Sequence, residues 1–528
     1  MTRRKAVIIP SVLLSLCAVA VATPAIADTA HESSPTPIPV SPVSASGQHA
    51  DSVVAAIERS AHTLRSTEPT GSLRDLDALG RMVRSAEVVG LGEATHGSQD
   101  FFRMKHRVFR YLVEKKGFRS FSLELPWSSG VRLNEYVLDG KGDLKDVARE
   151  EFQGSYRIWN NQDYLDLIEW MRGYNLRHPN DPVQFMGDDM GYVGPELYKR
   201  VTDYVSRRYP QLLERVTGLY RGLAPTTDAG TYSEEYFKLP LAERQERAER
   251  TGKVYELLRE QRPASGAAKQ DHLWMVQHAR AIHQMARGMA FDFTDETQSA
   301  AMMRLRDQVM AENVDWWHRH TGDRILLSAH NTHVSYDSFD TRYPKTQGAF
   351  LRDALDNDYV SIGFSFDQGA FKAFGTEDNV MRTYRVEAAK PGSNEHTLDK
   401  ARQDDYILDM RTAPALVRAW LDTERVTWNI GAGWPDPVEY RTALGRAHDI
   451  LIHLHDVAAT TYLGDPEQRR TAHRPGPASP EPPLPGDSPA LQDAVIGDGD
   501  DPARVSSVPV RDPRPSGVAD LCADRLEA

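Results

Sequence analysis

Residues 87–97 read EVVGLGEATHG, and this stretch decides the fold class. Its first half is a short apolar run that ends at Gly92, which is typical of a buried strand. Helical periodicity precedes the run over 72–82 and follows it over 98–114, where apolar residues recur every three or four positions. A buried strand between two amphipathic helices predicts an α/β unit.

The same alternation of strands and helices continues along the chain. Further strands are predicted over 118–125, 183–186, 324–328, 359–366 and 449–453. Between about residues 195 and 320 the pattern is almost continuously helical. We therefore expect an α/β fold with a largely parallel sheet flanked by helices on both faces. An inserted helical subdomain is expected to wall an open cleft.

The two ends of the chain differ from this central part. Residues 1–27 combine a basic start, an apolar segment and the small-residue site Ala25-Ile26-Ala27, which predicts a cleavable signal peptide and a secreted protein. The apolar segment is too short for a stable membrane anchor. Residues 28–50 and the Pro/Asp-rich residues 465–528 are expected to be a disordered linker and a disordered tail. This leaves 51–464 as one α/β domain.

Composition excludes several classes of protein. Of 528 residues, 63 are Lys or Arg and 75 are Asp or Glu, a formal net charge of −12. That balance argues against a nucleic-acid partner, whose phosphates need a positive surface. Two Cys residues exclude a disulfide framework and a Cys-rich metal module. Nothing in the sequence predicts an oligomeric state.

Ionisable residues follow the ends of four predicted strands. They are Glu93, His96, Glu124, Asp188, Asp189, His330 and His333. Because ligands bind at the carboxyl ends of parallel strands, we expect these side chains to share one site. A cap on the following turn is the simpler interpretation of Asp188 or Asp189.

The residue types favour activation of water. The sequence has no Gly-x-Ser-x-Gly nucleophile, no Walker motif and no zincin motif. A neutral imidazole at His96 can take a proton from water, and Glu93 or Glu124 can orient it. The sequence therefore predicts a hydrolase that needs no cofactor.

Two other classes of function stay open. His96, Glu93, Glu124, His330 and His333 could instead bind a divalent metal, in a metal-dependent hydrolase of another ester or a phosphoester. The third class is a non-enzymatic haem or metal binding protein.

Two further side chains are candidates for contacting a substrate. Arg306 shares a largely apolar face of the predicted helix 298–317, where a guanidinium needs a carboxylate or a ligand. Trp127 follows the second predicted strand and could wall the substrate.

The chain resembles the erythromycin esterase family. The matching blocks run in order from about residue 55 to 460: 92–97 (GEATHG), 101–104 (FFRM), 117–118 ending at Glu124, Trp159 with Asn161, 187–190 (GDDM), 306–314, 329–334 (AHNTHV), 363–364 and 393–395. The resemblance implies an α/β fold in which a helical portion forms one wall of the cleft.

The resemblance also implies a substrate and roles for individual residues. The family's hydrolases open the ring ester of macrolides with an activated water, so a small ester, most simply a macrolide, is the expected substrate. Carried over, His96 resembles the general base, with Glu93 and Glu124 as its carboxylate partners. His330 and His333 resemble the facing imidazoles. Lys105 stands where members often have Arg, and with Arg306 and Asp189 it is expected at the substrate or oxyanion.

Overall fold

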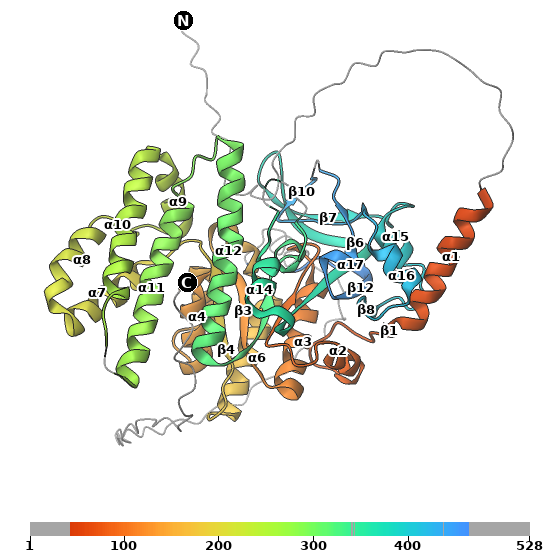
Figure 1. The fold of residues 1–528 in the computed structure, drawn as a ribbon, viewed down its shortest axis with the longest axis horizontal. Helices are drawn as coiled ribbons and strands as arrows, with labels where there is room; N and C mark the ends of the chain where they lie inside the picture. The colour runs from red at the N-terminus through yellow and green to blue at the C-terminus, as the bar shows by residue number, and fades with distance from the viewer. Residues whose placement is uncertain (1–42, 264, 339–341, 343, 437, 464–528) are drawn as a thin grey trace, which may run out of the picture. The chain divides into compact units, whose positions relative to one another are not determined.

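A ten-stranded sheet forms the centre of the protein (Figure 1). The structure is a computed structural model, and it describes residues 43–463 apart from 264, 339–341, 343 and 437. Parallel neighbours follow in the order β4 (Gln184–Asp189), β3 (Phe118–Pro126), β5 (Arg324–Ser328), β2 (Val88–Leu91), β6 (Tyr359–Gly375) and β12 (Ile450–Val457). The predicted largely parallel sheet is thereby confirmed.

Antiparallel strands extend the sheet beyond what the sequence predicts. β8 (Tyr406–Asp409) pairs with β12, β1 (His62–Thr63) pairs with β8, and β7 (Met381–Val386) pairs with the second half of β6. The short β10 (Gly433–Trp434) lies parallel to the end of β6, while β9 (Arg425–Val426) and β11 (Arg441–Thr442) form a separate pair.

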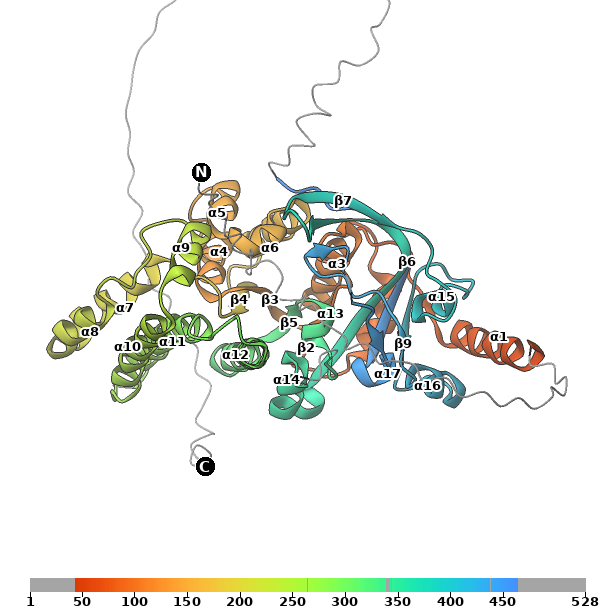
Figure 2. The same ribbon diagram turned by 90° about the horizontal axis from the view of Figure 1, so that it is seen from above.

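Helices cover both faces of the sheet, as Figure 2 shows for α3 and α6 on one side and α12 and α14 on the other. The helices on the N-terminal side of the chain are α2 (Asp77–Met82), α3 (Gln99–Lys116), α4 (Trp127–Asp139), α5 (Leu144–Glu151) and α6 (Gln162–Arg177). Those after β5 are α13 (Asn331–Val334), α14 (Gln347–Leu355), α15 (Asn394–Leu398), α16 (Ala415–Leu421) and α17 (Leu444–Ala447). Gly117, with φ +74°, ends α3 and lets the chain turn into β3.

Alternating side chains on the central strands give each face its own core. Val89 and Leu91 of β2 pack with the cluster that includes α3 and α6. Val88 of β2 and Ile325 and Leu327 of β5 pack with the cluster that includes α7, α11 and α12. A strand buried on both faces is apolar at every position, which is why these strands are recognisable as continuous apolar runs.

The helical portion lies beside the β4 edge of the sheet (Figure 1). It consists of α7 (Pro195–Arg208), α8 (Leu213–Tyr220), α9 (Ala229–Lys238), α10 (Leu241–Arg259), α11 (Ala267–Gly288) and α12 (Glu296–Thr321), close to the predicted range 195–320. α12 contacts β4 and β5, so this portion shares a core with the sheet.

The predicted boundary of the linker is wrong by part of a helix. α1 (Val43–Ser60) begins inside the range 28–50, because residues 43–50 contain no proline after Pro42 and continue directly into the amphipathic segment 51–60. The predicted signal peptide and the predicted tail lie outside the described residues. Among the described helices, none is both long and apolar enough to cross a bilayer.

Candidate active site

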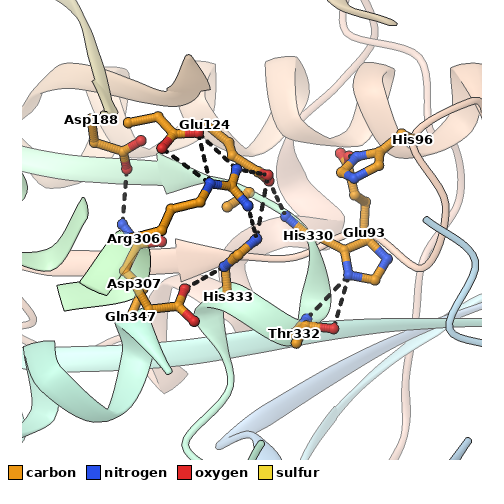
Figure 3. A network of polar contacts seen from close by, with 12 residues as sticks. Glu93, His96, Glu124, Asp188, Arg306, Asp307, His330, Thr332, His333 and Gln347 are labelled. Carbon is orange, nitrogen blue, oxygen red and sulfur yellow. Dashed lines mark hydrogen bonds and ion pairs between the residues drawn. The ribbon is translucent and has the colours of Figure 1, made fainter. Parts of the chain in front are cut away.

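The loops after β2, β3 and β5 bring the predicted residues together. These three strands are neighbours at the centre of the sheet, with β5 between β2 and β3. β6 follows β5 in the sequence but lies on the opposite side of β2 from β5, so the strand order reverses at β2. Such a switch point leaves a crevice at the carboxyl ends of the strands. Figure 3 shows side chains from the loops after β2 and β5, from the ends of β3 and β4, and from α12 and α14.

Glu93 and His96 form a pair in the loop after β2. Nδ1 of His96 lies 2.5 Å from Oε1 of Glu93. A carboxylate only accepts hydrogen bonds, so Nδ1 carries the proton and Nε2 is left as a base. Among the described residues, none hydrogen-bonds to Nε2 of His96, and the His96 side chain keeps 6% exposure to solvent.

Lys105 of α3 forms an ion pair with Glu93 and so fixes the position of that carboxylate. Its Nζ donates to the second oxygen of Glu93 and to the carbonyl oxygen of Ala329, the latter at 3.2 Å. The Lys105 side chain is fully buried. Burial lowers the pKa of Lys105 below its usual value, and the adjacent Glu93 carboxylate opposes that shift. The role predicted for Lys105 at the substrate is therefore wrong: it positions Glu93.

The two glycines that flank the pair allow close packing within the protein. A methyl group on Gly97 would lie 1.9 Å from the carbonyl oxygen of Lys372, and one on Gly92 would lie 2.1 Å from Oδ1 of Asn331. Neither glycine has a positive φ. The glycines thus bring the loop against β6 and α13, which fixes where His96 points.

A second network forms around Arg306 of α12 (Figure 3). Its guanidinium donates to both oxygens of Asp189, at 2.7–3.1 Å, and to Oε1 of Glu124 at 2.7 Å. His333 joins it: Nδ1 lies 2.5 Å from Oδ1 of Asp307, and Nε2 lies 3.3 Å from Oε1 of Glu124. Arg306 therefore meets carboxylates, as the sequence predicts.

Burial strengthens the charges in this network. Burial alone would raise the pKa of Glu124, but His333 and Arg306 outweigh it and hold that pKa well below its usual range. Burial would lower the pKa of His333, but Asp307 and Glu124 hold it well above the ordinary value. His333 is therefore a cation at neutral pH, and the network contains two cations among three carboxylates.

His330 lies between the two networks and stays neutral. Its ring centroid is 5.0 Å from that of His96. Nε2 of His330 donates to the carbonyl oxygen of Ile430 at 3.2 Å, and Nδ1 accepts from the backbone of Thr332 at 3.3 Å. Burial is the largest cause that holds the pKa of His330 well below its usual value.

The structure corrects two of the predicted contacts. Glu124 is not a partner of His96: its oxygens accept from Arg306, from His333 and, at 3.1 Å, from the backbone N–H of His330. Trp127 does not lie among the ionisable side chains either. It packs against Trp274, Trp316 and Trp317 and donates to His278. A substrate wall at Trp127 is thus unsupported.

Asp307 and Tyr156 are the site residues that the sequence analysis missed. Asp307 holds His333, and Tyr156 donates to Oδ2 of Asp189 at 2.9 Å. The sequence pointed to Asp307 only because it directly follows the candidate residue Arg306. Asp188 faces away from this group and accepts from Gln347 at 2.9 Å. Asp189 also makes a local turn contact, because its Oδ1 accepts from the backbone N–H of Met190 at 2.7 Å, whereas the N-cap of the next helix is Gly194.

The imidazoles do not form a metal site with the carboxylates. Both nitrogens of His330 and of His333 are engaged by protein groups, and Nδ1 of His96 is engaged by Glu93. Within the part of the chain that the structure describes, these five residues do not form a group with metal-ligand spacing. The arrangement supports direct activation of water instead.

Fold and site together define an α/β hydrolase whose strand-end loops hold a histidine–carboxylate pair beside a buried cationic network. The family model for erythromycin esterase matches residues 113–457, and the chain belongs to that family. It is an esterase, and members of the family are not known to need a cofactor. The alternative of a non-enzymatic haem or metal binding protein is thereby rejected.

Individual relatives share the sequence family or the fold. Erythromycin esterase type II of Escherichia coli is 23% identical over 353 residues, which cover 63% of this chain and 82% of that protein. A crystal structure of a Bacillus cereus protein superposes with a TM-score of 0.71 at 27% identity, covering 78% of this chain and 99% of its own. A crystal structure titled as a succinoglycan biosynthesis protein gives a TM-score of 0.69 at 28% identity, covering 78% and 98%.

Proposed function

We propose that this protein is a secreted esterase that opens the lactone ring of macrolides with a water molecule activated by His96. The observation that carries the proposal is the pair of Glu93 and His96. Its imidazole is oriented by a buried carboxylate, and its Nε2 atom has no hydrogen-bond partner among the described residues.

The first step is addition of water to the ester. Nε2 of His96 takes a proton from water while the water oxygen bonds to the carbonyl carbon, whose oxygen becomes an oxyanion. Glu93 stabilises the imidazolium that forms, and Lys105 keeps Glu93 in place. A positioned general base of this kind contributes about 10²–10⁴-fold to the rate.

Arg306 is the group best placed to stabilise the oxyanion. Its Nε and Nη2 atoms are bound to carboxylates, but Nη1 faces only Nε2 of His333, at 3.1 Å. Nη1 has no carboxylate partner among the described residues, so we propose that its N–H groups face the oxyanion. Donors held in place in this way stabilise charge that develops in the transition state.

Collapse of the intermediate completes the reaction. The bond between the carbonyl carbon and the ring oxygen breaks, and His96 returns its proton to the alkoxide that leaves. The product is one open chain with a hydroxyl group and a carboxylate. The macrolide is proposed as substrate because relatives such as the Escherichia coli enzyme are named for erythromycin.

Mass spectrometry of erythromycin and other macrolides incubated with the purified protein tests the proposal. We expect a gain of one water in wild type and none in His96→Ala. The matched control is His178→Gln, since His178 stacks on Tyr174 outside the site. Hydrolysis of simple esters without any macrolide would overturn the substrate. A wild-type rate in His96→Ala would overturn the general base.

Export is a separate part of the proposal. Residues 1–27 have the basic start, apolar segment and small-residue site of a signal peptide. Intact-mass measurement of protein from the culture medium should give a chain that begins at Asp28. A chain that stays in the cells with residues 1–27 attached would contradict it.

A further inference from the structure

A second group of ionisable side chains lies outside the network around His96 and Arg306. Asp367 on β6, Asp399 at the C-terminal end of α15 and His455 on β12 each offer one ligand atom, and these atoms lie within 4.8 Å of one another. Asp367 is buried, whereas Asp399 and His455 are half-buried, so an ion from solvent can reach the group.

In each of the two carboxylates, one oxygen accepts hydrogen bonds from the protein and the other has no donor among the described residues. Oδ1 of Asp367 accepts from the backbone N–H of Ala389 at 3.1 Å. Oδ1 of Asp399 lies 2.8 Å from Nδ1 of His455 and 3.3 Å from Nε2 of His453. Among the described residues, no donor reaches Oδ2 of Asp367 or Oδ2 of Asp399. A carboxylate oriented through one oxygen is a common arrangement around a bound metal.

The surroundings of the group are negative. Asp404 interacts electrostatically with His455, and Glu395 interacts electrostatically with Asp367. Asp405 accepts a hydrogen bond from the backbone N–H of His455 at 3.0 Å. No arginine or lysine forms an ion pair with Asp367 or Asp399 in the described parts of the chain. His455 and His453 form ion pairs with Asp399, at 2.8 and 3.3 Å, but Asp367 has no ion-pair partner among the described residues. A cation placed between the two carboxylates would offset the charge of Asp367.

We propose that Asp367, Asp399 and His455 bind one divalent cation of the Zn²⁺ type. A mixed set of imidazole and carboxylate ligands suits Zn²⁺ and similar transition metals, whereas Mg²⁺ and Ca²⁺ prefer oxygen alone. His453 lies behind Asp399 and receives support from Oγ of Ser365 at 2.9 Å, so it orients the carboxylate.

Such an ion would connect β6, β12 and the end of α15. The carbonyl oxygen of Asp367 also accepts from Nε1 of Trp428 at 3.3 Å, and two residues further on, Ile430 accepts from His330 of the active site. The ion is therefore structural: by binding only the native state, it raises the free energy of unfolding of the segment that supports His330.

Calorimetric titration of chelator-treated protein without a histidine tag, using ZnCl₂ alone, tests the proposal. We expect one Zn²⁺ to bind per chain and to raise the unfolding temperature. Asp367→Asn and His455→Gln should each abolish both effects. His453→Asn should weaken binding by about 10- to 100-fold.

A matched control separates this site from other histidines. His62 is exposed on β1, and His62→Gln should bind Zn²⁺ like wild type. Circular dichroism establishes that each variant is folded before titration. The proposal is overturned if wild type binds no Zn²⁺, or if Asp367→Asn binds it with wild-type affinity.

Discussion

At the scale of single residues, Lys105 and Glu93 form the most completely buried ion pair of the site. Both side chains have no exposure to solvent. Removing two charges from water is expensive, and their mutual attraction offsets this cost only while both are present. The pair is useful because it fixes a charged carboxylate against Nδ1 of His96.

Removing one member of this pair should destabilise the protein. We expect Lys105→Met to lower the free energy of unfolding by about 3–5 kcal/mol, because Glu93 is then buried without its partner. The double variant Lys105→Met/Glu93→Gln should regain part of that loss, since the unpaired charge is gone. Urea unfolding measures both. Equal stability of Lys105→Met and wild type would contradict the prediction.

Neutralising Glu93 should slow the reaction. In Glu93→Gln the amide cannot stabilise the imidazolium, so kcat should fall by about 10²–10⁴-fold. KM should change little, because Glu93 lies behind His96 and does not face the ligand. Steady-state kinetics on the best ester substrate measure the effect. An unchanged kcat would show that His96 does not depend on this carboxylate.

Sequence reasoning found most of the site residues but not their partners. Strand ends predict that Glu93, His96, Glu124 and His333 are near one another, because parallel strands end at one edge of the sheet. They do not predict which carboxylate meets which imidazole, since that depends on side-chain directions. Asp307 was missed because it lies on α12, and a helix surface has no comparable rule.

At the scale of elements, α12 connects the helical portion to the site. Arg306 and Asn313 are two turns apart on its inner face. The Asn313 side chain is fully buried: it donates to the carbonyl oxygen of Asp188 at 2.8 Å and accepts from Gln277 and Gln284 at 2.9 and 3.1 Å. It thereby ties α11 and α12 to the end of β4.

Loss of this connection should be measurable. We expect Asn313→Ala to lower the free energy of unfolding by about 1–3 kcal/mol, because buried groups on α11 and β4 lose their partner. Asp315→Ala on the solvent side of the same helix is the control and should change stability by less than about 0.5 kcal/mol. Chemical denaturation compares the two, and equal effects would contradict the role of Asn313.

The sequence predicts the elements best where a strand is buried on both faces. β2 and β5 have continuous apolar centres and β3 has apolar residues at 118, 121, 123 and 125, and all three strands were predicted. The second half of β6 was missed because residues 367–372 mix polar residues and glycine with apolar ones. β7 is half exposed, and β8 has only four residues, so neither produces a recognisable period.

At the scale of the whole molecule, the buried histidines couple stability to pH in opposite directions. His333 has a raised pKa and keeps its proton above pH 6.5, where the unfolded chain loses it. Its contribution is complete below pH 6.5 and is lost as the pH rises through the folded value. His330 has a lowered pKa, so its contribution is present above pH 6.5 and declines as the pH falls.

The free energy of unfolding should therefore decline on both sides of neutrality, with His333 contributing on the alkaline side and His330 on the acidic side. Between about pH 7 and about pH 9 we expect wild type to lose stability more steeply than His333→Asn, by up to about 1.4 kcal/mol per pH unit. Below pH 6.5, His330→Asn should make the acidic decline shallower without removing it, because burial also lowers the pKa of His106 to about 4 and the pKa values of His278 and His448 to about 3. Urea midpoints measured across this range for the three proteins test both assignments. Parallel curves for wild type and His333→Asn would mean that His333 is not charged in the folded protein, and Arg306 would then be the only cation of its network.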